Sequence, residues 1–374
     1  MSDTTFSDFE KPLFRKGDYF RGYELERPLG QGGLGTVWLV RHRVLDTLFA
    51  LKTLDPKVAE ERPEFVKRFV REAKIASKIH HPNLVAVHDA GYDAEKGIYY
   101  LVMDYVSGGT LREALAFSGV RSERDAVKIV LQVASALAAA RRFGLVHRDI
   151  KPENIMLTSD GMVKLVDLGV AKVTDGSDSL KTTANSVFGT PAYISPEQAR
   201  DSSTVDTRAD IYSLGIVLFE MLCGKRPYGG DTPRDIMQKL LDPAPIPDVR
   251  TFNKNVSPKL SAVLLLMCAK KPEARIASPE KLMETFVRIG YALPEGARTE
   301  FAATSEPEVV PVVLPNVPPE RAIHTLSFET KDKEIQEFVE QLKHRRRRSV
   351  MVKIALAAVG LLILALVVAF AVLF

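Results

Sequence analysis

One run of residues constrains this chain more than any other: His-Arg-Asp-Ile-Lys-Pro-Glu-Asn at positions 147–154, followed by Asp-Leu-Gly at 167–169. The run places the carboxylate of Asp149, the ammonium group of Lys151 and the amide of Asn154 within six residues. Pro152 has no backbone N–H to give to a helix, so these polar groups are predicted to lie in a loop.

The residues after this loop predict a hairpin. Two short apolar runs, 155–157 and 163–165, flank Ser-Asp-Gly at 159–161, which is the composition of a tight turn. Such a hairpin would return Asp167 to the side of Asn154, where a carboxylate oxygen and an amide oxygen suit Mg²⁺ bound to phosphate. Asp149 would then orient a hydroxyl nucleophile, and Lys151 would neutralise charge on a phosphate group in transfer.

With this spacing, the stretch resembles the catalytic loop and the metal-binding triplet of eukaryotic-like protein kinases. The resemblance covers about residues 23–289 and implies an α+β, bilobal kinase fold with a small β-rich N-lobe and a larger helical C-lobe. It implies ATP and Mg²⁺ as cofactors, with Mn²⁺ as an alternative metal. It assigns Asp149, Lys151 and Lys52 to catalysis, and Asn154 and Asp167 to metal binding.

A glycine-rich segment at 30–37 fits the kinase pattern G-x-G-x-x-G-x-V, with strands predicted on either side at 23–29 and 36–41. Glycines let a turn approach a triphosphate, so that backbone N–H groups meet its oxygens without a Cβ in the way. The resemblance implies an ATP site made of Leu29, Gly30, Gln31, Gly32, Gly33, Leu34, Gly35, Val37, Ala50, Lys52, Glu72, Met103, Asp104 and Val106.

Lys52 lies in the middle of a β-rich run at 48–54, where a lysine is costly to bury without a partner. Glu72 is the predicted partner, because apolar residues recur at helical spacing over 65–76 and Glu72 lies near their stripe. By resemblance, Lys52 holds the α and β phosphates of ATP and Glu72 orients Lys52 through an ion pair.

A strand, a hinge and a long helix are predicted between this helix and the catalytic loop. His-His-Pro at 80–82 ends the first helix and starts the strand, and its histidines are interpreted as structural because no further Cys or His lies nearby. Residues 99–109 resemble the hinge between kinase lobes. There Met103 would guard the back of the adenine pocket, and backbone groups of Asp104 and Val106 would hydrogen-bond adenine. Ser122 marks the start of the long helix.

Residues 167–197 are rich in hydroxyl groups and, by composition alone, form a mobile loop. By resemblance they are the activation segment, where a phosphate on Thr182 or Thr183 would pair with Arg148 and order the loop. Thr190 is a further regulatory candidate. It belongs to Gly-Thr-Pro at 189–191, which together with Lys151 favours serine or threonine over tyrosine as the acceptor.

The resemblance also implies two structural anchors. Asp210 would start a buried helix at 210–222 and brace the backbone of the catalytic loop. Arg275 would pair with Glu197, the acid that closes the activation segment.

Composition is that of a folded globular protein, with 46% hydrophobic and 26% charged residues. The formal net charge of +4 is small, so no nucleic-acid partner is expected. Cys223 and Cys268 lie far apart in apolar runs and are interpreted as buried, reduced thiols of a cytosolic domain.

The segments outside 23–289 are interpreted from their composition. Residues 1–22 read as a mostly mobile tail whose aromatic side chains pack on the domain, and 290–325 as a Pro-rich flexible linker. Residues 326–348 read as a juxtamembrane amphipathic helix with a basic cluster. Residues 354–374 carry no charge, and as a helix they would cross the ~30 Å hydrocarbon core of a bilayer.

The arginines Arg345 to Arg348 beside this span fit the positive-inside rule and contact with anionic lipid. The expectation is a single-pass membrane protein with a cytoplasmic kinase domain, at the inner or plasma membrane if the source is bacterial. Membrane lipid is therefore an expected partner. Protein substrates, and a second copy of the chain for trans-autophosphorylation, are the others.

Together these observations predict a membrane-anchored, ATP-dependent serine/threonine protein kinase that also phosphorylates its own activation segment. Leu168 and Ser195 depart from the family's usual Phe and Ala, and neither change removes a catalytic group. Two alternatives stay open: a pseudokinase scaffold that binds nucleotide or partners without turnover, and a phosphotransferase acting on small molecules. The intact Lys52, Asp149, Asn154 and Asp167 speak against the first, and the Gly-Thr-Pro to Ser-Pro-Glu segment at 189–197 against the second.

Overall fold

The computed structural model describes residues 13–167, 192–200, 205–230 and 232–294, apart from the side chains of Arg68 and Glu72. The predicted juxtamembrane helix and membrane span lie outside these residues, as do Thr182, Thr183 and Thr190. None of the helices within the described ranges is long and apolar enough to cross a membrane.

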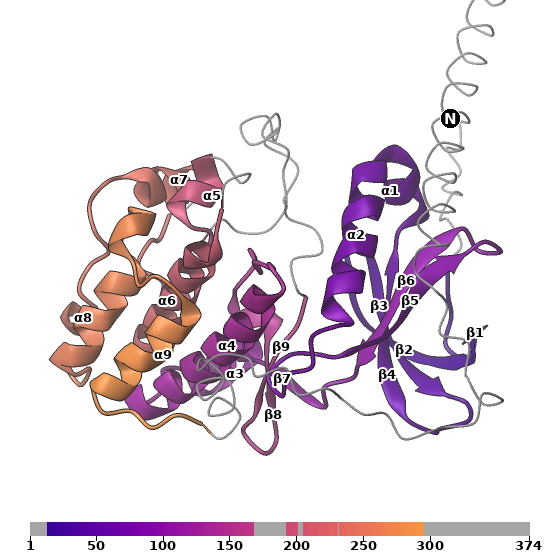
Figure 1. The fold of residues 1–374 in the computed structure, drawn as a ribbon, viewed down its shortest axis with the longest axis horizontal. Helices are drawn as coiled ribbons and strands as arrows, with labels where there is room; N and C mark the ends of the chain where they lie inside the picture. Colours follow the sequence, from indigo (N-terminus) through magenta and orange to yellow (C-terminus); the bar gives the residue numbers. More distant parts are fainter. Residues whose placement is uncertain (1–12, 168–191, 201–204, 231, 295–374) are drawn as a thin grey trace, which may run out of the picture. The chain divides into compact units, whose positions relative to one another are not determined.

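The N-terminal lobe is built on a six-stranded antiparallel sheet in the order β1-β2-β3-β4-β6-β5 (Figure 1). The glycine-rich segment turns between β2 and β3. Lys52 lies in the middle of the sheet, because β4 pairs Lys52 with Val37 on one side and with Leu101 on the other. The strands are β1 Tyr19–Phe20, β2 Tyr23–Gly32, β3 Gly35–His42, β4 Leu48–Leu54, β5 Val87–Asp93 and β6 Ile98–Asp104.

Two helices, α1 (Pro56–Glu61) and α2 (Pro63–Ala76), follow β4, and each begins with a proline, which costs a first-turn residue no hydrogen bond. The helix predicted over 65–76 is confirmed as α2. The strand predicted directly after His-His-Pro is wrong, since β5 begins only at Val87. The reason is Asn83, whose side-chain nitrogen donates to Gln132 and to the Val163 carbonyl and so holds this stretch against the helical lobe.

The sheet also takes in residues that the sequence assigned to the tail. Phe14 and Phe20 are buried, and the ring of Phe20 packs edge-on against Phe14 and Tyr100 at centroid distances of 5.2 Å. β1 pairs with β2 through Tyr19 and Phe20. Packed structure therefore begins before Tyr23, and the expectation that the tail's aromatic residues pack on the domain holds for these two rings.

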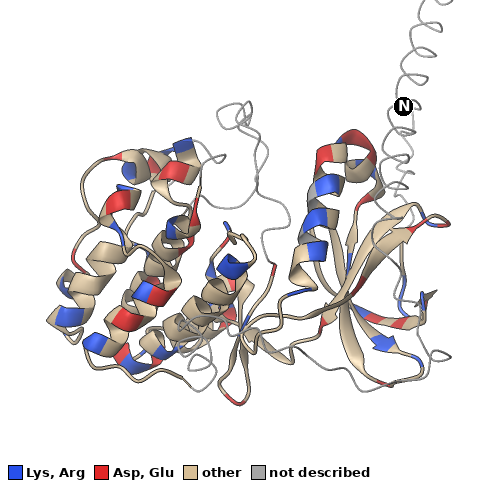
Figure 2. Ribbon diagram, in the orientation of Figure 1, with Lys and Arg blue, Asp and Glu red and all other residues tan. Residues whose placement is uncertain are grey.

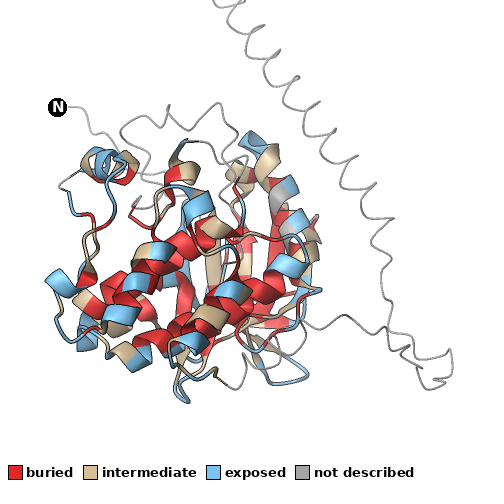
Figure 3. Cartoon of the chain, turned by 60° about the vertical axis from the view of Figure 1, so that its left-hand side comes forward, coloured by how far each residue is buried: buried red, intermediate tan, exposed pale blue. Residues whose placement is uncertain are grey.

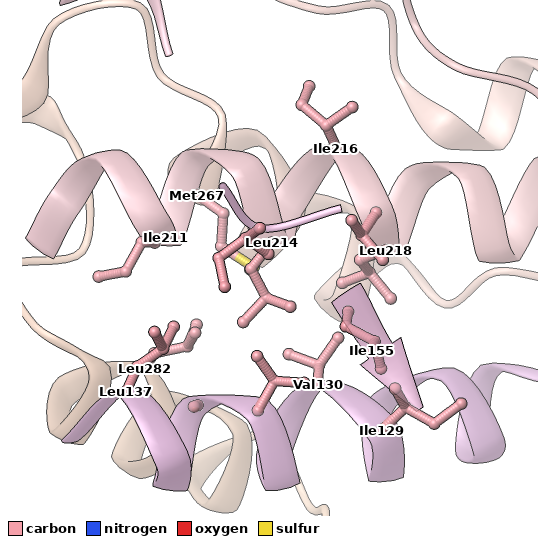
Figure 4. Close-up of a cluster of buried hydrophobic side chains, with 14 of the residues drawn as sticks. Ile129, Val130, Leu137, Ile155, Ile211, Leu214, Ile216, Leu218, Met267 and Leu282 are labelled. Carbon is pink, nitrogen blue, oxygen red and sulfur yellow. The ribbon is translucent and has the colours of Figure 1, made fainter. Parts of the chain in front are cut away.

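The second lobe is helical and carries a three-stranded sheet in the order β7-β8-β9 (Figure 1). Its long helices α4 and α6 face each other through aliphatic side chains, among them Val130 and Leu137 from α4 and Leu214 and Leu218 from α6 (Figure 4). Its strands and α-helices are β7 Gly108–Thr110, α3 Leu111–Ser118, α4 Glu123–Arg142, β8 Ile155–Thr158, β9 Val163–Leu165, α5 Pro196–Arg200, α6 Thr207–Cys223, α7 Pro233–Leu241, α8 Pro258–Met267 and α9 Pro279–Arg288. Its short 3₁₀ turns are η1 Pro152–Asn154, η2 Val249–Thr251 and η3 Pro272–Ala274.

The buried face of each amphipathic helix turns inward and its polar face outward (Figure 3). α6 is the exception, because nearly every residue along it is buried. It is therefore the central element of this lobe, as its apolar sequence predicts. Lysine, arginine, aspartate and glutamate are interspersed over the outer faces of the other helices (Figure 2).

Packing continues past the predicted end of the domain at 289. Tyr291 and Leu293 lie against the apolar core, and the Tyr291 hydroxyl donates to Glu123 at the start of α4. The two cysteines are free thiols: Cys268 is buried as expected, whereas Cys223, the last residue of α6, is only half-buried. Desolvation raises the pKa of Cys268 to about 12, so this thiol stays protonated at neutral pH.

Candidate active site

The loop 147–154 joins α4 to β8, and the Asp210 side chain holds it through hydrogen bonds to its backbone. The backbone N–H groups of His147 and Arg148 donate to the two Asp210 carboxylate oxygens at 2.8 and 2.7 Å. Arg148 takes a left-handed backbone conformation, with φ of 65°, which the paired bonds stabilise. Burial raises the pKa of Asp210, while the N–H donors and nearby positive charges oppose that rise. The bracing role that the family resemblance implied for Asp210 is thus present in the geometry.

Asp210 does not start its helix, contrary to the sequence expectation. α6 begins at Thr207, and Asp206 caps it by accepting the Arg208 N–H at 2.8 Å. Asp210 lies one turn further on, where its own helix leaves the carboxylate free to face the loop. The cap was missed because an aspartate at either position is compatible with a helix start.

His147, to which the sequence gave no separate role, is fully buried and connects the two ends of the site. Its Nε2 lies 3.1 Å from the Val166 carbonyl oxygen, and its Nδ1 accepts the Asp149 N–H at 3.3 Å. These partners place the ring proton on Nε2, because a carbonyl can only accept. The imidazole therefore links the catalytic loop to the residue just before Asp167.

The acid, the cation and the amide predicted from the loop sequence do converge. Lys151 Nζ lies 2.9 Å from Asp149 Oδ2, and the Asn154 side-chain nitrogen donates to the same oxygen at 3.0 Å and to the Asp149 carbonyl at 2.8 Å. The side-chain nitrogen of Asn154 is thus hydrogen-bonded to Asp149, and its side-chain oxygen is the atom that suits a metal. The Asp149 carboxylate is oriented by two donors, as a group that must accept a hydroxyl proton requires.

The predicted hairpin also forms, as β8 and β9, and Val166 N–H donates to the Asn154 carbonyl at 3.0 Å beside Asp167. Lys52 Nζ contacts Asp167 Oδ1 at 2.5 Å, so this ion pair joins β4 to the residue that follows the β8–β9 hairpin. Desolvation would raise the pKa of Asp167, but the charge and hydrogen bond of Lys52 outweigh it and hold that pKa below its ordinary value. Asp167 is therefore ionised and able to bind a cation.

Glu72, the predicted partner of Lys52, lies on α2, but its side chain is outside the described residues. The Lys52–Glu72 pair therefore stays a prediction. The contact between Lys52 and Asp167 was not predicted, since 115 residues separate the two in sequence.

The predicted ATP residues 29–37 all lie on the β2–β3 hairpin, and most of them are exposed. Gly35 has a φ of 150°, and a Cβ built there would lie 1.8 Å from the Thr53 carbonyl oxygen. Only glycine fits this position. The Leu34 carbonyl accepts the Asp55 N–H at 2.9 Å and joins the tip of the hairpin to the end of β4.

Four predicted nucleotide-site residues form one apolar cluster beneath this hairpin. Ala50, Met103 and Val106 are buried together with Val85, and Val37 packs against them. Met156 of β8 and Val166 complete the cluster from the helical lobe. Sequence reasoning missed Val85, Met156 and Val166, because each is an ordinary strand or loop residue whose position depends on the packing of the two lobes. Apolar side chains of this kind suit contact with the flat face of adenine.

The hinge follows β6, and some of its polar groups already form hydrogen bonds within the protein. The Asp104 N–H donates to the Ala86 carbonyl at 3.0 Å, so any adenine contact of Asp104 has to come from its carbonyl oxygen. The Asp104 carboxylate lies 2.6 Å from His88 Nε2 and accepts the Ala86 N–H at 3.2 Å. Val106 N–H makes no backbone hydrogen bond to another described residue, which suits a donor to a ligand.

The metal donors fit the predicted cation. Asp167 supplies a carboxylate oxygen and Asn154 an amide oxygen, a set that Mg²⁺ accepts when phosphate oxygens and water complete its shell. Across the described ranges no group of three or more His, Cys, Asp or Glu side chains forms a metal site by itself. The interpretation of the 80–82 histidines as structural agrees with His81, which is buried with its Nε2 3.1 Å from Ser135 Oγ.

The comparison with protein families decides what this arrangement is. Residues 23–287 match the model of the protein kinase domain. The chain belongs to the protein kinase family. Its relatives place the domain among the eukaryotic-like serine/threonine kinases, as the resemblance of the catalytic loop indicated.

Three relatives show how similar this kinase domain is in sequence to known serine/threonine kinases. The chain is 39% identical over 279 residues to the serine/threonine-protein kinase PknB of Mycobacterium tuberculosis, covering 74% of this chain and 44% of PknB. It is 37% identical over 291 residues to PrkC of Bacillus subtilis, covering 78% of this chain and 44% of PrkC. A probable serine/threonine-protein kinase of Clostridium acetobutylicum is 39% identical over 262 residues, which is 70% of this chain and 39% of the relative. The chain thus spans less than half the length of these relatives.

Among solved structures, the PknI kinase domain of M. tuberculosis superposes with a TM-score of 0.58 at 30% sequence identity. The match covers 74% of this chain and 98% of the PknI chain. The two-lobed kinase fold is therefore shared.

The part of the activation segment at 168–191 lies outside the described residues, and with it the predicted phosphorylation sites Thr182, Thr183 and Thr190. Arg148, their predicted partner, makes no ion pair with any described carboxylate. The C-terminal end of the segment is held twice. Arg275 pairs with Glu197, as predicted, and the Gln198 side chain donates to the Arg148 carbonyl at 3.0 Å.

Ser195, one of the departures from the family pattern, is fully buried. Its Oγ and N–H both lie 3.1 Å from the Gln198 side-chain oxygen. The serine thus adds a hydrogen bond that alanine could not make, and it helps to orient the glutamine that reaches the catalytic loop.

Proposed function

We propose that this chain is an ATP-dependent serine/threonine protein kinase. The observation that carries the proposal is the convergence of Asp149, Lys151 and Asn154 in one loop, with Asp167 brought beside them and paired with Lys52. Protein kinases use these five residue types, in the same order along the chain, for phosphoryl transfer.

In the proposed reaction Asp149 accepts the proton of the substrate hydroxyl and orients its oxygen. Lys151, 2.9 Å from Asp149, neutralises charge that develops on the transferred phosphoryl group. Asn154 and Asp167 would hold Mg²⁺, which would supply charge stabilisation on the phosphates. Lys52 would hold the α and β phosphates, and the apolar cluster around Met103 would take the adenine.

The further features of the proposal rest on the sequence. Residues 354–374 would anchor the chain in a membrane as a single span, with Arg345 to Arg348 on the cytoplasmic side against anionic lipid. Phosphorylation of Thr182 or Thr183 by a second copy of the chain would supply an anion for Arg148 and order the activation segment.

The test is a phosphotransfer assay on the full-length chain in detergent, with ATP and Mg²⁺, beside an Asp149→Asn variant. Asparagine keeps the shape of Asp149 but cannot accept a proton, so the stable, folded variant should lose activity. We expect mass spectrometry to find phosphothreonine or phosphoserine within residues 174–190 of the wild type only.

Nucleotide binding without phosphate on the chain itself or on a generic basic protein would instead support a scaffold. The anchoring proposal has its own test: alkaline carbonate should leave the full chain in the membrane pellet and release a variant that lacks 354–374.

A further inference from the structure

Gln198, in the short helix α5, connects the end of the activation segment to the catalytic loop. Its side-chain nitrogen donates to the Arg148 carbonyl at 3.0 Å, and its side-chain oxygen lies 3.1 Å from both the N–H and the Oγ of Ser195. The Ser195 N–H can only donate and the Arg148 carbonyl can only accept, so these partners fix which end of the amide is the nitrogen. The segment therefore holds the glutamine, and the glutamine donates to the loop.

The Arg148 carbonyl belongs to the peptide group that directly precedes the catalytic acid. The other polar atom of that peptide group, the Asp149 N–H, donates to His147 Nδ1 at 3.3 Å. The peptide plane is thus held at both of its polar atoms, once from within the loop and once by Gln198 from α5. Because a peptide group is planar, fixing both atoms leaves little freedom to the Cα atom of Asp149.

This peptide group needs support from outside the loop, because Arg148 has a left-handed backbone with a φ of 65°. Such a conformation is unfavourable for a residue with a Cβ and persists only where the surroundings hold it. Asp210 accepts the Arg148 N–H at 2.7 Å, and Gln198 donates to the Arg148 carbonyl. Loss of either bond would let the peptide group rotate toward a more common conformation.

Resting on the proposed kinase activity, we propose that Gln198 is a positioning residue for phosphoryl transfer, which sets the backbone of the catalytic acid Asp149 through the Arg148 carbonyl. Lys151 and Asn154 orient the carboxylate of Asp149. Gln198 orients the peptide group from which that side chain projects. The end of the activation segment is therefore part of what aligns the group that accepts the substrate proton.

Ser195 is the residue through which the activation segment holds Gln198. It is fully buried, and its Oγ adds a second donor to the Gln198 oxygen beside its own N–H. Alanine, the family's usual residue here, would keep only the backbone donor. The serine thus strengthens the hold on Gln198, and through it the hold on the Arg148 carbonyl.

The test measures kcat and the KM for ATP of the full-length chain with Gln198→Glu. Glutamate keeps the shape of glutamine and an oxygen for Ser195, but it cannot donate to the Arg148 carbonyl. We expect kcat to fall about tenfold, because a misaligned acid accepts the proton less well. The KM for ATP should stay within about twofold of wild type, because no nucleotide contact changes. An unchanged kcat, or a loss that comes mainly from a raised KM, overturns the proposal.

Three further variants locate the effect. Gln198→Met removes both bonds without adding a charge and should lower kcat at least as much as Gln198→Glu; full activity in it would assign the loss to the charge and overturn the proposal. Ser195→Ala leaves one donor to Gln198 and should lower kcat by less. A larger loss would place the effect in the serine itself and contradict the proposed chain of contacts. Gln238→Met, at an exposed glutamine on α7, is the matched control and should behave as wild type.

Amide hydrogen exchange needs no turnover and distinguishes failure of this inference from failure of the proposed activity. In folded Gln198→Glu and Gln198→Met, the amides of residues 145–152 should exchange about tenfold faster than in wild type, because their peptide groups are held less firmly. Gln238→Met should exchange as wild type does. Faster exchange without phosphotransfer in any protein, wild type included, would sink the proposed activity but keep the support that Gln198 gives to the loop. Unchanged exchange would sink that support, whatever the activity.

Discussion

Arg275 holds the Glu197 carboxylate through both of its terminal nitrogens, at 2.6 and 2.7 Å. The Arg275 side chain has no exposed surface, and it also donates to the carbonyls of Ala269, Arg208 and Lys270. A single residue thus joins α5, the start of α6 and the turn after α8.

Arg275→Ala should destabilise the protein by about 3–5 kcal/mol, because it leaves a carboxylate and three carbonyls without their donor. Urea unfolding followed by circular dichroism measures this loss. Arg250→Ala, at an exposed arginine in the same lobe, is the control and should stay within about 0.5 kcal/mol of wild type. Equal effects of the two substitutions would contradict the structural role given to Arg275.

Phe20→Ala should cost about 3–5 kcal/mol, as expected for a large aromatic side chain removed from a core. Phe20 is 3% exposed, whereas Phe117 in α3 is 95% exposed. Phe117→Ala removes the same atoms from water and should change the free energy of unfolding by no more than about 0.5 kcal/mol. Denaturant titration of both variants tests the claim that packed structure begins ahead of Tyr23, and a mild effect at Phe20 would refute it.

Gly35→Ala should destabilise the sheet by about 1–3 kcal/mol or more, because the new Cβ would overlap the Thr53 carbonyl oxygen and the residue has a positive φ. Gly32→Ala is the matched control in the same hairpin, since nothing lies within 4 Å of a Cβ added there. Thermal unfolding without nucleotide should separate the two variants. If their melting temperatures coincide, the close approach of β3 to β4 at this point is incorrect.

His81 should make stability depend on pH between 6.5 and 4. Burial, and then the charges of Lys164 and Arg142, lower its pKa from 6.5 to about 4 in the folded protein. The unfolded chain therefore binds an extra proton in this range, and stability is complete above pH 6.5 and falls as the pH drops. Between pH 7 and 5 the loss should be about 2 kcal/mol. Urea midpoints of wild type and His81→Gln at both pH values measure it, and the variant should lack this part of the loss.

Local sequence signals predicted the elements that carry the chemistry. The catalytic loop, the β8–β9 hairpin and the strand around Lys52 could be placed because each function-bearing residue lies within a few positions of its motif. The catalytic groups of a short loop lie close together in sequence, so a motif reveals them directly. The composition of a turn predicts that the two strands beside it pair as a hairpin.

The contacts that the sequence did not reveal are long-range. Arg112 meets partners 41, 81 and 108 residues away, and nothing in the local sequence around it distinguishes it from any exposed helical arginine. The burial of Phe14 and Phe20 depends likewise on Tyr100, which a distant strand supplies. Such contacts become visible only when the fold has brought the elements together.

The paired hydrogen bonds from His147 and Arg148 to Asp210 separate two kinds of motion in this kinase domain. Asp210 belongs to the helix at the centre of the largest apolar core, the part of a domain that opens last. A displacement of the exposed glycine-rich hairpin would therefore leave the loop that carries Asp149 in register with that core.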